Sequence, residues 1–214
     1  MQDWPSHEEK DMARIVVSEF VTLDGVMEDP GGAESFEHGG WSFQFDRGPD
    51  GNKFKVDELL AADALLLGRV TYLGFAKAWP TMHNEFADKM NSMRKYVVST
   101  SLSDDTATWN NTTVIRSDVV AELTRLKAEP GGDLLVGGSA RLVQALVENG
   151  LVDEYRLMVY PIVLGTGKRL FGDVSPARLA LAEARSTGDG IMMLTYHPAA
   201  AVPAVTAEQG AVAK

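Results

Sequence analysis

The sequence predicts an α/β domain in which a mixed, mostly parallel sheet lies between helices. Short apolar runs typical of strands alternate with helical patterns from residue 14 to residue 160, an order that favours parallel strands with helices packed on the sheet. Residues 133–150 show the unit most clearly: a buried strand, a two-glycine turn and an amphipathic helix. Two last strand patterns have no helix between them, so we expect an antiparallel C-terminal hairpin.

The N-terminal half contains the first elements and a long loop. A run rich in β-branched residues predicts a strand over 14–20. Asp24–Gly25 is a turn signal, and the loop that follows extends to about Asn52. Its aromatic residues favour an ordered lid or pocket wall over disorder. After it we expect a helix over 55–62, a central strand over 64–67, a helix from 68 to about 80, and an amphipathic or irregular connection over 82–93.

The C-terminal half repeats the alternation and then changes character. We expect strands over 95–100, 112–116 and 154–160, a helix over 118–128, and the two hairpin strands over 179–186 and 191–197. Residues 1–12 are expected to form a flexible extension and residues 198–214 a flexible tail, because neither shows periodicity. One domain over residues 13–197 remains, as the length of 214 residues suggests.

Composition excludes several classes of function. A formal net charge of −10 argues against binding nucleic acid through its phosphates. The sequence has no cysteine, which excludes disulfides and thiolate chemistry, and its four histidines show no ligand spacing, so we expect no metal. The polar, acidic N-terminus is no secretory signal and no apolar run reaches membrane-spanning length, so we expect a cytoplasmic protein without a membrane partner.

The Gly137–Gly138 turn is a candidate anion site. Glycines permit a sharp turn and a close approach of the backbone, and Ser139 can cap the helix that follows. The N-terminus of such a helix attracts anions through its free N–H groups and its dipole, although helix packing alone would also explain the glycines. Four predicted strands end in small or polar residues, and ligands bind at such strand ends in α/β sheets. These segments are 18–24, 68–71, 99–101 and 137–140.

A set of short motifs in this order resembles the dihydrofolate reductase-like fold. The closest resemblance is to the C-terminal reductase domain of the bacterial riboflavin-biosynthesis bifunctional deaminase/reductase and its stand-alone relatives. That resemblance implies a three-layer α/β/α domain with a mixed, mostly parallel sheet and the hairpin described above. The motifs are TLDG (22–25), LLGRVTY (66–72), YVVST (96–100), VGGSA (136–140), VDEYR (152–156) and PIVLGTG (161–167).

The resemblance implies NADPH as cofactor and assigns its contacts by position. The cofactor's phosphates would meet Gly68, Arg69 and Thr71, and its adenosine side would meet Ser99, Thr100 and Ser101. Its pyrophosphate would lie against Gly137, Gly138, Ser139 and Ala140. The nicotinamide and the substrate would be bordered by Leu23, Asp24 and Gly25.

The substrate side has fewer candidates, and each has a structural alternative. Asp24 is the candidate catalytic and substrate-facing residue, and its alternative role is to form the Asp–Gly turn. Trp41 and Phe43 would wall the substrate ring, or else pack in the core. Glu154 would face the site, or else form an ordinary strand start with Asp153. No acid near the first helix stands in the motif that anchors the pterin in dihydrofolate reductases, which argues against dihydrofolate as substrate.

The combined interpretation is an NADPH-dependent reductase that transfers a hydride to a small pterin- or pyrimidine-like heterocycle. One alternative is the riboflavin-pathway reduction of 5-amino-6-(5-phosphoribosylamino)uracil, whose phosphate would call for a basic cluster. The first loop offers only Arg47, Lys53 and Lys55 for it. The other alternative is a non-catalytic NADP-binding module. The resemblance also implies a homodimer.

Overall fold

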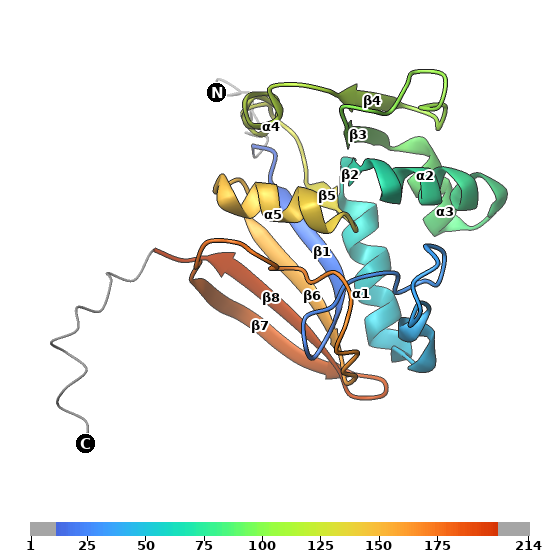
Figure 1. Ribbon diagram of the computed structural model, residues 1–214, viewed down its shortest axis with the longest axis vertical. Coiled ribbons are helices and arrows are strands. Elements are labelled where there is room, and N and C mark those ends of the chain that lie inside the picture. The colour runs from blue at the N-terminus through green and yellow to red at the C-terminus, as the bar shows by residue number, and fades with distance from the viewer. Residues whose placement is uncertain (1–11, 201–214) are drawn as a thin grey trace, which may run out of the picture.

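One eight-stranded sheet forms the centre of the protein in the computed structural model, which describes residues 12–200 (Figure 1). The strand order is β4-β3-β2-β5-β1-β6-β8-β7. The first six strands in this order are parallel, and β8 runs antiparallel to both β6 and β7. The predicted mixed sheet with its C-terminal hairpin is thus confirmed. The strands are β1 (Ile15–Thr22), β2 (Ala64–Gly68), β3 (Arg94–Val98), β4 (Thr112–Ile115), β5 (Leu134–Val136), β6 (Glu154–Tyr160), β7 (Leu179–Thr187) and β8 (Ile191–Pro198).

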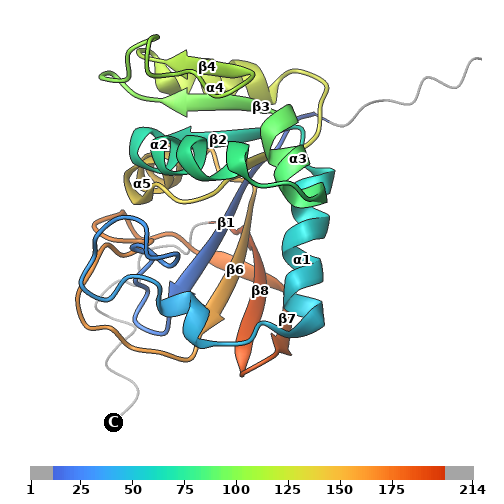
Figure 2. The same ribbon diagram turned by 90° about the vertical axis from the view of Figure 1, so that its right-hand side faces the viewer.

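Helices cover both faces of the sheet, which confirms the predicted three-layer arrangement. One apolar cluster joins the sheet to the first three helices, and a second joins it to the last two. Figure 2 shows α2, α3 and α1 on the near side of the strands. The helices are α1 (Gly48–Ala61), α2 (Arg69–Ala78), α3 (Glu85–Ser92), α4 (Val119–Lys127) and α5 (Ala140–Glu148), with short 3-10 turns at Trp41–Gln44 and Trp79–Thr81.

Alternation along the central strands divides the core between the two faces. Val16 of β1 packs in the cluster under α1 to α3, whereas its neighbours Ile15 and Val17 pack in the cluster under α4 and α5. Successive side chains point to opposite faces of a strand, so a strand covered on both sides must be apolar throughout. This explains the uninterrupted apolar run of β2, in which Leu66 and Leu67 are completely buried.

The sheet opens beside β1 because β5 is only three residues long. β5 pairs with β1 over Ile15, Val16 and Val17, whereas β6 pairs with β1 from Val16 to Thr22. Among the described residues, the side of β1 that faces β5 therefore has no strand partner over residues 18–22. We call this opening the β1–β5 split. Figure 2 shows β1 and β6 running steeply across the direction of β2, β3 and β4.

The long loop after β1 packs on the far end of the sheet. Trp41 is completely buried, and its indole Nε1 donates a hydrogen bond to the Glu28 carbonyl oxygen at 2.8 Å. Its ring meets the ring of Tyr160 edge to face, with 5.2 Å between centroids. Met158, Ile191 and other hydrophobic residues complete this third cluster. The loop is therefore a packed wall, as its aromatic content predicted.

Element boundaries differ from expectation at a few places. α1 begins seven residues earlier than predicted, with a proline in its first turn, where the missing N–H costs nothing. The connection over 82–93 contains α3, which Asn84 caps by accepting from the Ala87 amide at 2.9 Å.

The folded domain also extends slightly beyond its predicted limits. Met12 bridges Pro130, and Pro198 pairs with Leu179 in the hairpin. The rest of the predicted flexible ends, residues 1–11 and 201–214, lies outside the described residues. Within the described range, no helix combines the length and the apolar character needed to cross a bilayer.

Candidate active site at the carboxyl ends of the strands

The structure places the four predicted segments on four neighbouring strands. Segments 68–71, 99–101 and 137–140 lie at the ends of β2, β3 and β5, whereas 18–24 covers the second half of β1 and the turn after it. These strands are adjacent in the sheet and parallel, so all four segments lie toward the same edge. The segments differ in how far they lie along the strand direction. The register pairs Val17 with Val136, so Leu23 lies six residues further along β1 than the end of β5, about 20 Å at the rise of a strand. The four segments thus lie along the β1–β5 split, and we call the region that they share the strand-end site.

Two glycines bring the N-termini of α2 and α5 together. Gly138 has a φ of +71°, and a Cβ there would lie 2.7 Å from the Thr71 Oγ1. A Cβ on Gly68 would lie 2.8 Å from the Ser139 Oγ. Neither position has room for a side chain, and Gly138 also needs a backbone conformation that other residues rarely adopt. Their lack of a side chain is what allows the two helix ends to meet.

Ser139 joins these helix ends but does not cap α5 with its side chain, which corrects the expectation from sequence. It occupies the N-cap position in a left-handed conformation, with a φ of +73°. Its Oγ accepts a hydrogen bond from the Gly68 amide at 2.7 Å and donates one to the Thr71 Oγ1 at 2.9 Å. Thr71 is itself buried, so its hydroxyl serves the junction between the helices.

The junction leaves several donors available to an anion. In the part of the chain that the structure describes, the first two amides of α2 and of α5 have no backbone hydrogen-bond partner. Arg69 is the first residue of α2, and Arg141 is the second residue of α5. Both are exposed, and neither has an ion-pair partner among residues 12–200. Paired helix N-termini with free arginines fit a pyrophosphate. Sequence analysis missed Arg141, although its position two residues after Ser139 was a usable signal.

The end of β3 adds a turn rich in hydroxyl groups. The Ser99 Oγ accepts hydrogen bonds from the amides of Ser101 and Leu102, at 3.2 and 3.0 Å. Thr100 and Ser101 are exposed. Because Val98 pairs with Gly68 in the sheet, this turn lies beside the start of α2. It therefore places hydroxyl groups next to the helix N-termini.

Asp24 organises the loops around the end of β1. Its carboxylate accepts hydrogen bonds from the Thr22 Oγ1 at 2.6 Å and from the amides of Leu164 and Gly165, at 3.2 and 2.9 Å. These donors, Thr22 first, lower the pKa of Asp24, so that its carboxyl is ionised at neutral pH. The contacts favour the turn-forming alternative for Asp24 over a proton-donating one.

Two candidate substrate contacts are corrected by their positions. Trp41 is completely buried and offers no surface to a ring. Glu154 begins β6, so it lies at the edge of the sheet opposite the four predicted segments, where it pairs with Arg14 and Arg156 at 3.1 and 2.5 Å. The alternatives of core packing and strand start describe these two residues. Phe43, by contrast, is 77% exposed and Leu23 is 64% exposed.

Glu19 is a second functional candidate that sequence analysis missed. It lies on β1 and is only 6% exposed, and its Oε1 has no hydrogen-bond partner within the described chain. Burial raises the pKa of its carboxyl to about 8, against the opposing effects of Lys55 and the Gly138 amide, while Glu58 raises it further. A Ser–Glu pair inside an otherwise apolar strand was the available signal.

A charged group lies behind Glu19, where α1 packs on β1. The Lys55 ammonium pairs with Glu58 and donates a hydrogen bond to the Ser18 Oγ at 2.7 Å. Ser18 in turn donates to the Glu58 Oε1 at 2.7 Å. The Glu58 side chain is 3% exposed and that of Lys55 is 19% exposed. This buried group therefore places paired charges next to the strand that carries Glu19.

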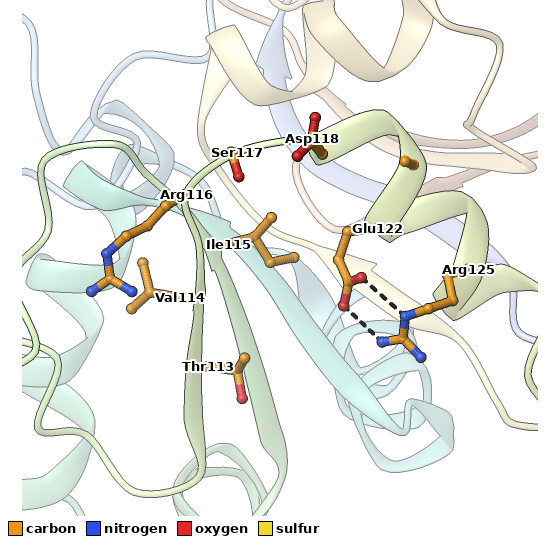
Figure 3. A pocket seen from close by; sticks show the side chains of 9 residues that line it. Thr113, Val114, Ile115, Arg116, Ser117, Asp118, Glu122 and Arg125 are labelled. Atoms are coloured by element: carbon orange, nitrogen blue, oxygen red, sulfur yellow. Dashed lines mark hydrogen bonds and ion pairs between the residues drawn. The ribbon is translucent and has the colours of Figure 1, made fainter.

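Two hollows on the surface of the described residues lie away from this site. One lies between β4 and α4, where Figure 3 shows Arg125 donating hydrogen bonds to Glu122 along the helix. The other lies beside α2 and α3. None of the predicted segments lines either hollow. Across residues 12–200, no three of the histidine, aspartate and glutamate side chains gather as a metal site would require.

The fold and the site together define an α/β domain with two helix N-termini joined at the carboxyl ends of its strands. The chain belongs to the family described as the RibD C-terminal domain, whose profile matches residues 13–193. The Bacillus subtilis (strain 168) uncharacterized protein YyaP is 30% identical over 190 residues, which cover 86% of this chain and 94% of that protein.

Solved structures show the same fold. A protein from Shewanella sp. PV-4 that is named for riboflavin biosynthesis superposes with a TM-score of 0.70 at 20% identity, covering 87% of this chain and 99% of that one. Dihydrofolate reductase from Enterococcus faecalis, solved with NADP(H), superposes with a TM-score of 0.53 at 15% identity, covering 86% and 96%. The dihydrofolate reductase-like architecture expected from the sequence motifs is therefore confirmed.

Proposed function

We propose that the protein is an NADPH-dependent reductase that transfers a hydride to a small pterin- or pyrimidine-like heterocycle. The observation that carries this proposal is the junction of Gly68, Gly138 and Ser139, which holds two helix N-termini together with Arg69 and Arg141 free beside them. This is a cradle for a pyrophosphate. Membership of the RibD C-terminal domain family supports the reductase assignment.

Each of the four strand-end segments has a role in this proposal. The α2–α5 junction binds the pyrophosphate, and the Ser99–Ser101 turn binds the adenosine side. Leu23 and Gly25 border the reacting rings, while Asp24 fixes the loops that surround them. A reduced nicotinamide bound here supplies the hydride; the protein supplies placement and the exclusion of water.

The charges near the substrate end favour an unphosphorylated heterocycle. Lys53 pairs with Asp57, and Lys55 pairs with Glu58. Arg47 lies over the ring of Phe20, with its guanidinium carbon 5.4 Å from the centroid. These three cations thus already have partners, as do Lys168 and Arg169, which pair with Glu28 and Asp24. A substrate phosphate would have to displace those partners. We therefore place the phosphoribosylaminouracil reduction second.

Cofactor titration is the first test. The purified protein is titrated with NADPH and then with NADH while nucleotide fluorescence is followed, and we expect NADPH to bind. Failure of both nucleotides to bind would end the reductase proposal. Oxidation of NADPH is then measured with a panel of pterins, pyrimidines and quinones. Binding without oxidation across that panel would support the non-catalytic module instead.

Two further expectations belong to this proposal. From the family resemblance we propose a homodimer, which light scattering tests directly. We also propose a cytoplasmic location for the reductase, which fractionation of cells that produce the protein would test.

A further inference from the structure

A buried carboxyl without a full set of partners lies beside the β1–β5 split. The register pairs Val17 with Val136, so Glu19 lies level with Gly138, two residues after β5 leaves the sheet. Glu19 is 6% exposed and its Oε1 has no partner in the described part of the chain. An unpartnered polar atom at this depth is costly, and functional sites are where proteins tolerate such groups.

The surroundings of Glu19 stabilise a neutral carboxyl that can still lose its proton. Burial opposes the charged form most strongly. Lys55 and Glu58 of α1 are the charged groups that act on it, with opposite effects, and the Gly138 amide from the α5 turn is its backbone donor. Because Gly138 also belongs to the α2–α5 junction, Glu19 lies between that junction and the loop that follows β1.

On the basis of the reductase function proposed above, we propose that Glu19 is the proton donor to the heterocycle. The hydride of the reduced nicotinamide bonds to the carbon of a C=N group, and the π electron pair of that group moves onto nitrogen. The nitrogen takes the proton of the Glu19 carboxyl, whose O–H bond breaks. The products are a C–H and an N–H bond, an oxidised nicotinamide, and a Glu19 carboxylate that water reprotonates.

The assignment to Glu19 rather than Asp24 follows from their surroundings. Asp24 is held ionised by three hydrogen-bond donors, so it has no proton to give at neutral pH. Glu19 has one unpartnered oxygen and one backbone donor. A carboxyl that is neutral at the operating pH satisfies what general acid catalysis requires.

The first test needs neither cofactor nor substrate. Glutamate carboxyl carbons are labelled with carbon-13 and followed by NMR as the pH is raised. We expect one resonance to titrate near pH 8 and to be missing from Glu19→Gln. If every glutamate carboxyl of the wild-type protein titrates below about pH 6, the proposal is overturned. This result decides the state of Glu19 even if the variant does not fold.

The second test uses NADPH alone. Ionisation of Glu19 adds a negative charge beside the pyrophosphate turn, so wild-type affinity should fall about tenfold between about pH 7 and about pH 9. Glu19→Gln should change less than about twofold over that range. The control Glu183→Gln removes an exposed carboxylate of β7 and should follow the wild type. The same pH dependence in Glu19→Gln as in the wild type would contradict the proposal.

The third test measures turnover with each panel compound that the wild type reduces. Glu19→Gln should bind NADPH at about neutral pH as the wild type does, yet lose about 100-fold or more in kcat. A kcat within about threefold of the wild type would overturn the role as proton donor. Absence of NADPH binding at any pH would instead count against the proposed function, while the NMR titration would still decide the state of Glu19.

Discussion

Gly137 and Gly138 are neighbours whose surroundings impose different requirements. Gly138 needs a positive φ and has no room for a Cβ, whereas nothing lies within 4 Å of a Cβ on Gly137. We expect Gly138→Ala to lower the free energy of unfolding by about 1–3 kcal/mol and to weaken NADPH binding. Gly137→Ala should cost less than about 1 kcal/mol. Urea unfolding of both variants checks this, and equal losses would contradict the steric argument.

The variant Arg69→Ala tests how the α2–α5 junction contacts the cofactor. Its guanidinium is free at the start of α2, so Arg69→Ala should weaken NADPH about 10- to 100-fold. If Arg69 binds the 2′-phosphate, NADH affinity should change far less; equal weakening would place it at the pyrophosphate. Arg94→Ala is the control, because it removes an exposed arginine at the start of β3, the opposite edge of the sheet.

Glu19 also predicts how stability depends on pH. Its pKa in the folded protein, about 8, is higher than the ordinary value of 4.5, so folding favours the neutral form. The stability it contributes is fully present below about pH 4.5 and is lost as the pH rises through about 8. Relative to Glu19→Gln, the wild type should therefore lose unfolding free energy over that range. Urea unfolding of both proteins across it measures the difference, and a constant difference would contradict the raised pKa.

At the scale of elements, Asp24 connects the end of β1 to the loop after β6. Asp24→Ala removes the acceptor for the Leu164 and Gly165 amides, so hydrogen exchange at those two amides should accelerate about tenfold or more. Asp173→Ala, at an exposed position of the same loop, should leave them unchanged. Lost turnover in Asp24→Ala with unaltered exchange would restore Asp24 as a catalytic candidate.

At the scale of the whole molecule, the two edges of the sheet separate stability from binding. At the edge where β1, β5 and β6 begin, Arg14 and Arg156 form ion pairs with Asp133 and Glu154. Glu154→Gln should lower the free energy of unfolding by about 1–3 kcal/mol, because it leaves two partly buried arginines with Asp133 as their single carboxylate partner. NADPH affinity should stay within about twofold of the wild type. A large loss of affinity would return Glu154 to the binding site.

Much of this architecture follows from local sequence features. Apolar runs, the glycine turns and the missing helix before β8 were enough to predict a mixed sheet between helices. Ser99, Gly68, Gly137 and Leu23 were assigned to one edge because each follows a strand, and parallel strands end at the same edge. Such features depend on residues that are close together in the chain, so the sequence alone is enough to predict them.

Tertiary structure decided how these parts meet. The Ser139 side chain was assigned to a helix cap, yet it bonds Gly68 and Thr71, about 70 residues earlier in the chain. Trp41 is in the core and Glu154 is at the wrong edge, because packing and strand direction determine which face or end a side chain occupies. The Ser–Glu pair marks β1 as unusual, but the position of Glu19 beside Gly138 depends on the register of β1 with the short β5, because strand pairing brings distant segments together.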